Sequence, residues 1–93
     1  MLASELIKKV VDEKQAYLFK EVVRNIPMEK GEPFQYDVMS YSEAKNVIGW
    51  VILDLFTASA MLAVYNALSE DKRPLYDQLS FMKLVDFTWK HVK

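Results

Sequence analysis

The sequence predicts an all-α fold, a small helical bundle that forms one helical domain over residues 1–93. Three observations favour this class. The chain has only two glycines and three prolines, few for the many turns of an all-β fold. Hydrophobic residues make up 52% of the chain and charged residues 27%, so a folded core is expected rather than disorder. Apolar residues also recur at helical spacing along most of the chain.

The first predicted helix is amphipathic and covers residues 4–26. Ser4 is its predicted N-cap, and Pro27 ends it because proline cannot continue a helix. Charged residues occupy the side that faces outward. The apolar side consists of Leu6, Ile7, Val10, Val11, Tyr17, Leu18, Val22 and Ile26.

A connector with two prolines follows at residues 27–39, PMEKGEPFQYDVM. Phe34, Tyr36 and Val38 alternate with polar residues, so a short extended edge strand is one interpretation. We expect instead that these side chains fold back and cap one end of the bundle.

A long central helix, largely buried, is predicted over about residues 42–68, with Ser40 or Ser42 as its N-cap. Its residues 47–65 carry one charge, Asp54. Nineteen residues could span roughly 30 Å of hydrocarbon. However, Asp54 near the middle would cost about 3 kcal/mol in a membrane, and the flanks lack an asymmetry of basic residues. We therefore expect a buried helix and no membrane span.

This central helix is apolar around most of its circumference, so it must be covered on several sides. A chain of 93 residues has little material for that cover, and the sequence therefore predicts a homo-oligomer. Small residues gather on one side of the helix, where another helix should approach closely. They are Gly49, Ala60, Ala63 and Ala67.

Two shorter helices complete the predicted bundle. Ser69 begins one over residues 69–79, which Pro74 keeps short or irregular. Ser80 caps the last one, which runs through Val92 and presents Phe81, Leu84 and Val85 on one face. The segment 69–93 has the size of a helix-turn-helix, which leaves a nucleic-acid-binding regulator as the alternative function.

Charge argues against that alternative. Twelve basic and thirteen acidic residues give a net charge of −1, and the last helix offers few side chains that read base edges. The chain contains no cysteine, which suits a reducing compartment, and its start does not read as a signal peptide. We therefore expect a cytoplasmic protein.

Catalytic patterns are also missing from the sequence. His91 is the single histidine, close to the end of the printed chain, and no glycine-rich phosphate loop is present. Acidic residues do not follow the spacing of a calcium loop. We expect no enzyme activity, no cofactor and no metal ion.

The remaining candidates for function are large aromatic side chains and one carboxylate. The aromatic residues are numerous for so short a chain, and they belong either to the core or to a protein interface. Asp54 either faces solvent or a satisfied polar contact, or it forms a buried ion pair that sets register. The interface candidates are Phe34, Tyr36, Trp50, Asp54, Phe87 and Trp89.

The segments YNALS (65–69) and LSFMKLVDFTWK (79–90) resemble the ends of small uncharacterised proteins encoded by bacteriophages and prophages. The resemblance covers about the last thirty residues and contains no catalytic motif. It implies a short accessory protein that binds another protein and modulates or inhibits it, for example a defence protein of the host.

Overall fold

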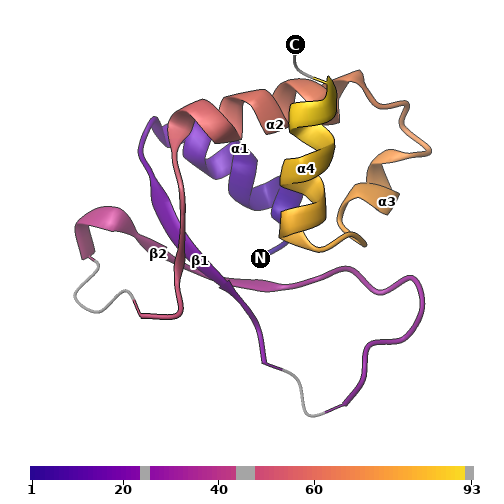
Figure 1. Cartoon of the computed structure of the whole chain (residues 1–93), viewed down its shortest axis with the longest axis horizontal. Helices are drawn as coiled ribbons and strands as arrows, with labels where there is room; N and C mark the ends of the chain where they lie inside the picture. Colours follow the sequence, from indigo (N-terminus) through magenta and orange to yellow (C-terminus); the bar gives the residue numbers. More distant parts are fainter. Residues whose placement is uncertain (24–25, 44–47, 92–93) are drawn as a thin grey trace.

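The computed structural model describes residues 1–23, 26–43 and 48–91 (Figure 1). It shows an α/β fold with a three-stranded antiparallel sheet, so the predicted all-α class and helical bundle are wrong. The elements in chain order are α1 (Ala3–Glu13), β1 (Tyr17–Glu21), β2 (Tyr36–Ser40), the 3-10 turn η1 (Tyr41–Glu43), β3 (Val51–Leu53), α2 (Leu55–Ala67), α3 (Arg73–Tyr76) and α4 (Phe81–His91).

Strand β1 lies at the centre of the sheet, in the order β2-β1-β3. Tyr17 of β1 pairs with Ser40 of β2 on one side and with Leu53 of β3 on the other. The outer edge of β2 is bonded at Tyr36, whose backbone N–H donates to the Met1 carbonyl at 2.8 Å. The Met1 amino group donates in return to the Tyr36 carbonyl at 3.0 Å.

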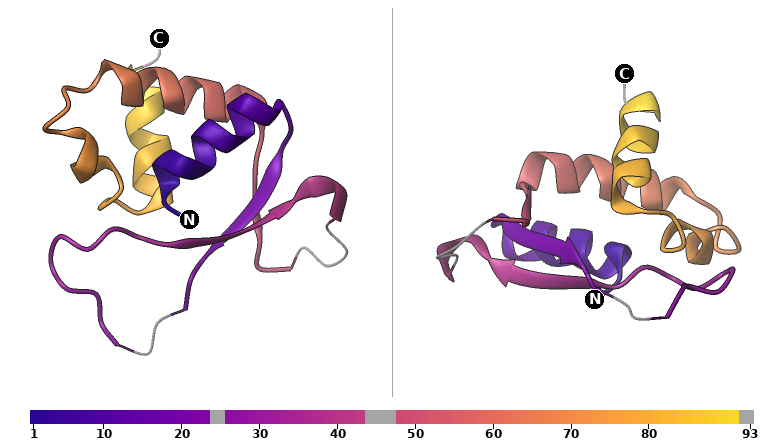
Figure 2. Two further views of the ribbon diagram at one scale, coloured as in Figure 1. Left: turned by 180° about the vertical axis from the view of Figure 1, so that it is seen from behind. Right: turned by 60° about the horizontal axis from the view of Figure 1, so that its bottom comes forward.

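The helices lie on one side of the sheet. The right-hand view of Figure 2 shows the sheet at the bottom, α1 above it and α2 above α1. Helix α4 crosses α2, and its carboxyl end extends past α2. The core fills the space between the sheet and the helices. It consists of Ala3, Leu6, Ile7, Val10, Tyr17, Phe19, Tyr36, Leu53, Ala58, Met61, Tyr76, Phe81 and Leu84.

The predicted first helix is too long, because α1 ends at Glu13 and Lys14 adopts a left-handed conformation with φ 53°. The following Tyr17 and Phe19 are aromatic residues that favour strands, and Tyr17 and Leu18 happen to continue the helical spacing. Ser4 is not the N-cap. It lies inside α1, where Asp77 accepts hydrogen bonds from its amide and its hydroxyl.

The predicted central helix over 42–68 is wrong in its first half. Ser40 ends β2, Ser42 lies in η1, and residues 44–47 lie outside the described residues. Gly49 has φ +82°, a conformation that glycine adopts without strain but that a helix does not contain. The β-branched Val51 and Ile52 then form β3, and the helix begins only after Asp54.

The predictions for the C-terminal part of the chain agree more closely with the structure. The last helix is confirmed as α4 over Phe81–His91, while Val92 lies outside the described residues. The helix predicted over 69–79 is reduced to the single turn α3, and Pro74 lies in its first turn. In the connector, the expectation that Phe34, Tyr36 and Val38 cap one end of a bundle is wrong, because residues from Tyr36 to Ser40 form the edge strand β2; the extended interpretation is the one the structure supports. Within the described ranges, no helix is both long and apolar enough to cross a membrane.

Candidate functional site

Large apolar side chains stay exposed where β3 meets the flank of α4. Val51 is 48% exposed, Met82 is 65% exposed and Trp89 is 40% exposed. Val51 and Met82 line the same hollow beside Phe81, and Met82 and Trp89 share one side of α4 because they are seven residues apart. We call Val51, Met82 and Trp89 the β3–α4 patch.

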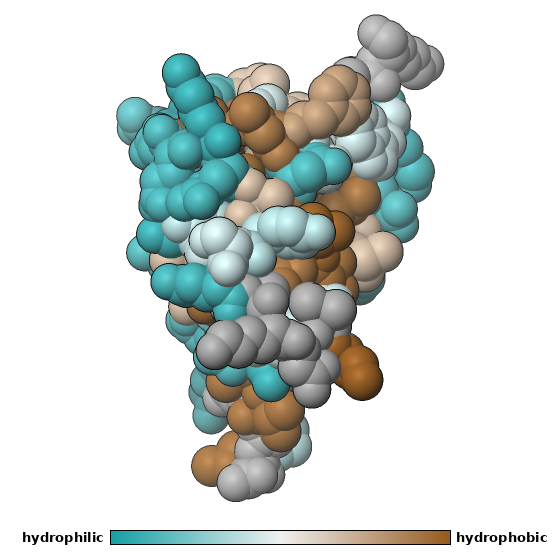
Figure 3. Space-filling model, turned by 90° about the vertical axis from the view of Figure 1, so that its left-hand side faces the viewer, coloured by the Kyte–Doolittle hydropathy of each residue, from teal (hydrophilic) through white to brown (hydrophobic). Residues whose placement is uncertain are grey.

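The β3–α4 patch borders an open sheet edge. β3 is the last strand in the order β2-β1-β3, so its side away from β1 faces no strand in the part of the chain that the structure describes. The space-filling view in Figure 3 faces the side of the molecule where β3 leads into α2. Apolar side chains gather there in the middle of the face, with hydrophilic ones at the upper left and along the right-hand edge.

A second apolar feature lies on the other flank of α4. There a groove of about 420 Å³ runs between α2 and α4. The small side chains of Ala63 and Ala67 leave this space open, and the rings of Phe87 and His91, 4.2 Å apart, form the opposite wall. We call it the α2–α4 groove. Its lining residues are Ala63, Val64, Ala67, Leu68, Phe87 and His91.

Helix α2 connects the two features through its outer face. The inner residues Ala58, Met61 and Val64 are buried. The outer face is exposed and contains no charged residue over the whole length of the helix. It consists of Leu55, Phe56, Ser59, Ala63, Asn66 and Ala67. Phe56 is 76% exposed and stacks on Trp89, with ring centroids 5.9 Å apart.

The structure separates the six interface candidates. Tyr36 is buried in the core, and Phe34 packs against the core from a half-buried position. Trp50 is half-buried, with the Lys20 ammonium 4.9 Å from its ring centre. Phe87 and Trp89 lie on opposite flanks of α4, in the groove and the patch respectively. Of the six candidates, only Phe87 and Trp89 therefore lie in the α2–α4 groove or the β3–α4 patch.

Asp54 has a local role. Its carboxylate accepts a hydrogen bond from the Thr57 amide at 2.7 Å, so it is the N-cap of α2. The side chain is exposed. The interpretation as a satisfied polar contact is thus correct, and the buried ion pair is wrong. Sequence reasoning missed Phe56 because it lies in the segment predicted to be a largely buried central helix, and it did not single out Met82. Asp54, two residues before Phe56, is a recognisable N-cap signal.

Buried hydroxyl groups offer no catalytic base. The hydroxyls of Tyr36 and Tyr76 are buried and have no hydrogen-bond partner among the described residues. Burial, together with the Glu21 carboxylate, raises the pKa of Tyr36 to about 12. Burial and the nearby Asp77 also raise the pKa of Tyr76. Both phenols therefore stay neutral at physiological pH.

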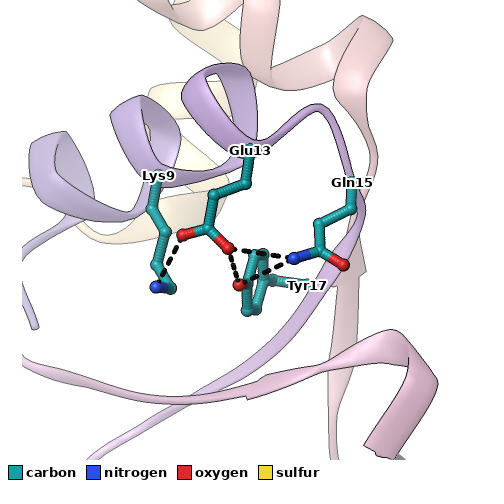
Figure 4. Close-up of polar contacts among 4 residues, drawn as sticks. All are labelled: Lys9, Glu13, Gln15 and Tyr17. Carbon is teal, nitrogen blue, oxygen red and sulfur yellow. Dashed lines mark hydrogen bonds and ion pairs between the residues drawn. The ribbon is translucent and has the colours of Figure 1, made fainter.

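A polar cluster joins the end of α1 to the start of β1 (Figure 4). Glu13 accepts hydrogen bonds from Lys9 at 2.7 Å, from the Tyr17 hydroxyl and from Gln15 at 2.9 Å. These bonds, the one from Lys9 first, lower the pKa of the Glu13 carboxyl to about 2. The bond to Glu13 raises the pKa of Tyr17. Every member thus has a partner, and the arrangement fastens α1 to the sheet.

Among the described residues, the structure shows no cluster suited to a metal ion and no surface suited to reading nucleic-acid bases. Residues 1–23, 26–43 and 48–91 contain no cluster of three or more acidic or histidine side chains that could hold a metal ion. In the segment predicted to resemble a helix-turn-helix, α3 is a single turn. Asp86 lies three residues after Lys83 and four before Lys90, so this acidic side chain shares the exposed face of α4 with both lysines. The nucleic-acid alternative stays a prediction that this geometry does not favour.

No protein-family model, curated protein or solved structure matches this chain. The resemblance to phage and prophage proteins therefore stays a prediction.

Proposed function

We propose that this protein is a non-catalytic binding protein that holds another protein on the β3–α4 patch. The observation that carries the proposal is the exposure of Val51 and Met82 beside an open strand edge. Exposed apolar surface next to unpaired backbone groups costs solubility, and proteins usually cover or blunt such edges. A partner that covers both would gain apolar contact and directional hydrogen bonds together.

The geometry supports strand addition as the mode of binding. An extended segment of the partner pairs with β3, and its backbone groups supply the hydrogen bonds that β1 supplies on the other side. Alternate side chains of that segment pack on Met82, which lines the same hollow as Val51, and on Trp89 farther along the same side of α4. Trp89 is the anchor, since tryptophan is enriched among residues that dominate binding energy.

The biological role follows from the resemblance of the C-terminal third to phage and prophage proteins. Such a protein acts by occupying the surface of a host protein, such as a defence protein, and so modulates or inhibits it. The absence of cysteine suits action in the reducing cytoplasm.

Affinity capture from a lysate of the expressing cell tests the proposal with matched variants. Met82→Glu places a charge in the patch, and the first turn of α4 accepts an acidic residue because the helix dipole favours it. Ile26→Glu is the control, because Ile26 is 73% exposed and lies outside the patch. We expect the wild type and Ile26→Glu to capture the same protein in similar amounts. Met82→Glu should capture at least tenfold less of it. Equal retention by all three would contradict the proposal.

A further inference from the structure

We propose that two copies of this chain pair through the outer faces of their α2 helices, in antiparallel orientation. In this dimer the Phe56 ring of each copy enters the α2–α4 groove of the other. The inference goes beyond the proposed function, which needs only the β3–α4 patch on the other flank of α4.

The first argument is the chemistry of the outer face. Thirteen residues of α2, from Leu55 to Ala67, include no lysine, arginine, aspartate or glutamate. A helix that is apolar around its circumference is normally covered on all sides. Both views of Figure 2 place α2 at the outer boundary of the molecule, with α1 on its inner side. The outer face is therefore left without cover by the described part of the chain, and two such faces can meet without charge repulsion.

The second argument is that this one face carries both a projection and a matching hollow. Phe56 projects at the amino end of α2, and Ala63 and Ala67 open the groove at the carboxyl end. In an antiparallel pair centred on Met61, the midpoint of Leu55–Ala67, Phe56 of one copy lies opposite Asn66 of the other. It therefore meets the space between Ala63 and Ala67. A groove of about 420 Å³ has room for one phenyl ring.

Residues near the twofold axis permit close approach. In the same register Ser59 of one copy lies opposite Ala63 of the other, and both side chains are small and exposed. Small residues at a helix crossing let the two axes come to the short end of the usual separation of about 8–10 Å. The arrangement is self-complementary, as an interface with twofold symmetry requires.

The size of the face sets the expected strength. Helix α2 is about 20 Å long, so it cannot by itself supply the roughly 800 Å² per partner of a standard interface. The wall of the groove on α4 adds contact from Phe87 and His91. We therefore expect a weak dimer that dissociates on dilution through the micromolar range.

Sedimentation or light-scattering mass against concentration is the first test. The wild type should move from monomer to dimer as concentration rises. Ala63→Arg fills the groove from an exposed position and should leave a folded monomer, and Phe56→Ala should weaken the dimer at least tenfold. Ile26→Ser alters an equally exposed apolar residue elsewhere and should leave the dimer unchanged.

Cross-linking tests the orientation, because the chain has no cysteine of its own. Under mild oxidation, a mixture of Ser59→Cys and Ala63→Cys proteins should form covalent dimers faster than either variant alone. In a parallel pair, each variant alone would form covalent dimers faster than the mixture. A control with Ser42→Cys should not cross-link.

The inference is overturned if the wild type stays monomeric at every concentration, or if Phe56→Ala dimerises as tightly as the wild type. A monomer that still captures a protein through Met82 would overturn the dimer and leave the proposed function standing. A dimer that captures no protein would overturn the proposed function and leave the dimer standing.

Discussion

Helices α1 and α2 pack against each other, yet their outer sides differ completely. α1 buries Leu6, Ile7 and Val10 and turns charged residues such as Glu5 and Asp12 to solvent. α2 buries Ala58, Met61 and Val64 but turns uncharged residues outward, with Phe56 the largest. The same core thus supports one helix suited to water and one suited to further burial. The difference is the physical ground for proposing α2, rather than α1, as the helix that pairs with a second copy.

The starts of the two helices differ as well. α1 begins in the interior, where the Asp77 carboxylate accepts from the Ser4 amide at 2.9 Å and from the Ser4 hydroxyl at 2.7 Å. α2 begins at the surface with its own neighbour Asp54 as cap. The start of α1 is thus held by a residue 73 positions away as well as by its own Glu5, which accepts from the Leu2 amide at 2.8 Å, whereas α2 begins by a local signal, Asp54.

The largest expected effect comes from the inner side of α2. Met61→Ala removes a fully buried side chain packed toward α1, and the cavity should lower the free energy of unfolding by about 2–5 kcal/mol. Ser59→Ala on the outer face should change it by less than about 0.5 kcal/mol. Urea denaturation measures both. A Met61→Ala loss as small as that of Ser59→Ala would show that the two sides of α2 do not differ as described.

The buried cap of α1 comes next. Asp77→Ala leaves the Ser4 amide and hydroxyl without acceptors, and we expect a loss of about 1–3 kcal/mol in the free energy of unfolding. Asp77→Asn keeps one acceptor oxygen and should lose less. Denaturant unfolding curves of the wild type, Asp77→Asn and Asp77→Ala give the order of their free energies of unfolding. Equal stability of Asp77→Ala and the wild type would mean that α1 does not depend on this distant residue.

The exposed cap of α2 should matter less. Asp54→Ala removes one hydrogen bond to Thr57 in a solvated position, at a cost of about 1 kcal/mol. Asp54→Asn preserves an acceptor and serves as the matched control. Thermal melts compare them, and a loss larger than that of Asp77→Ala would reverse the proposed ranking of the two caps.

The smallest effect concerns the end of α1, and it depends on pH. The pKa of Glu13 is lowered to about 2 in the folded chain, below its usual value of 4.5, so its contribution is present above pH 4.5. That contribution is lost as the pH falls toward 2, because the folded state then takes up the proton as well. The wild type should therefore melt higher than Glu13→Gln at pH 6, and the difference should vanish near pH 2. Tyr17→Phe removes one of the hydrogen bonds to Glu13. In that background, the loss of melting temperature that Glu13→Gln causes at pH 6 should therefore be smaller.

Local signals account for the parts of the fold that could be predicted. Phe81, Leu84 and Val85 at helical spacing predict α4, because a single amphipathic face is enough to fix a helix. Prediction fails where strand residues continue a helical spacing by coincidence, as Tyr17 and Leu18 do after α1. Gly49 and the β-branched Val51 and Ile52 were signals for a break before α2, and the low charge of residues 47–65 concealed them.

The candidate surface could be predicted only in part. Trp89 and Phe87 were recognisable as large aromatic residues in excess of what a small core needs. Tyr36 belongs to the same class in the sequence, yet it is buried between Phe19 and Phe81. No local pattern separates these residues, since their exposure depends on which elements pack above them.

The sequence by itself determines the apolar, uncharged character of residues 55–67, the N-cap Asp54 and the helix Phe81–His91, because each depends on neighbours in the chain. Only the tertiary structure decides which side of α2 is covered, that β1 pairs with both β2 and β3, and that Asp77 reaches Ser4. These features depend on contacts between distant segments. Their free energy comes from burial and hydrogen bonds that exist only once the whole chain is folded.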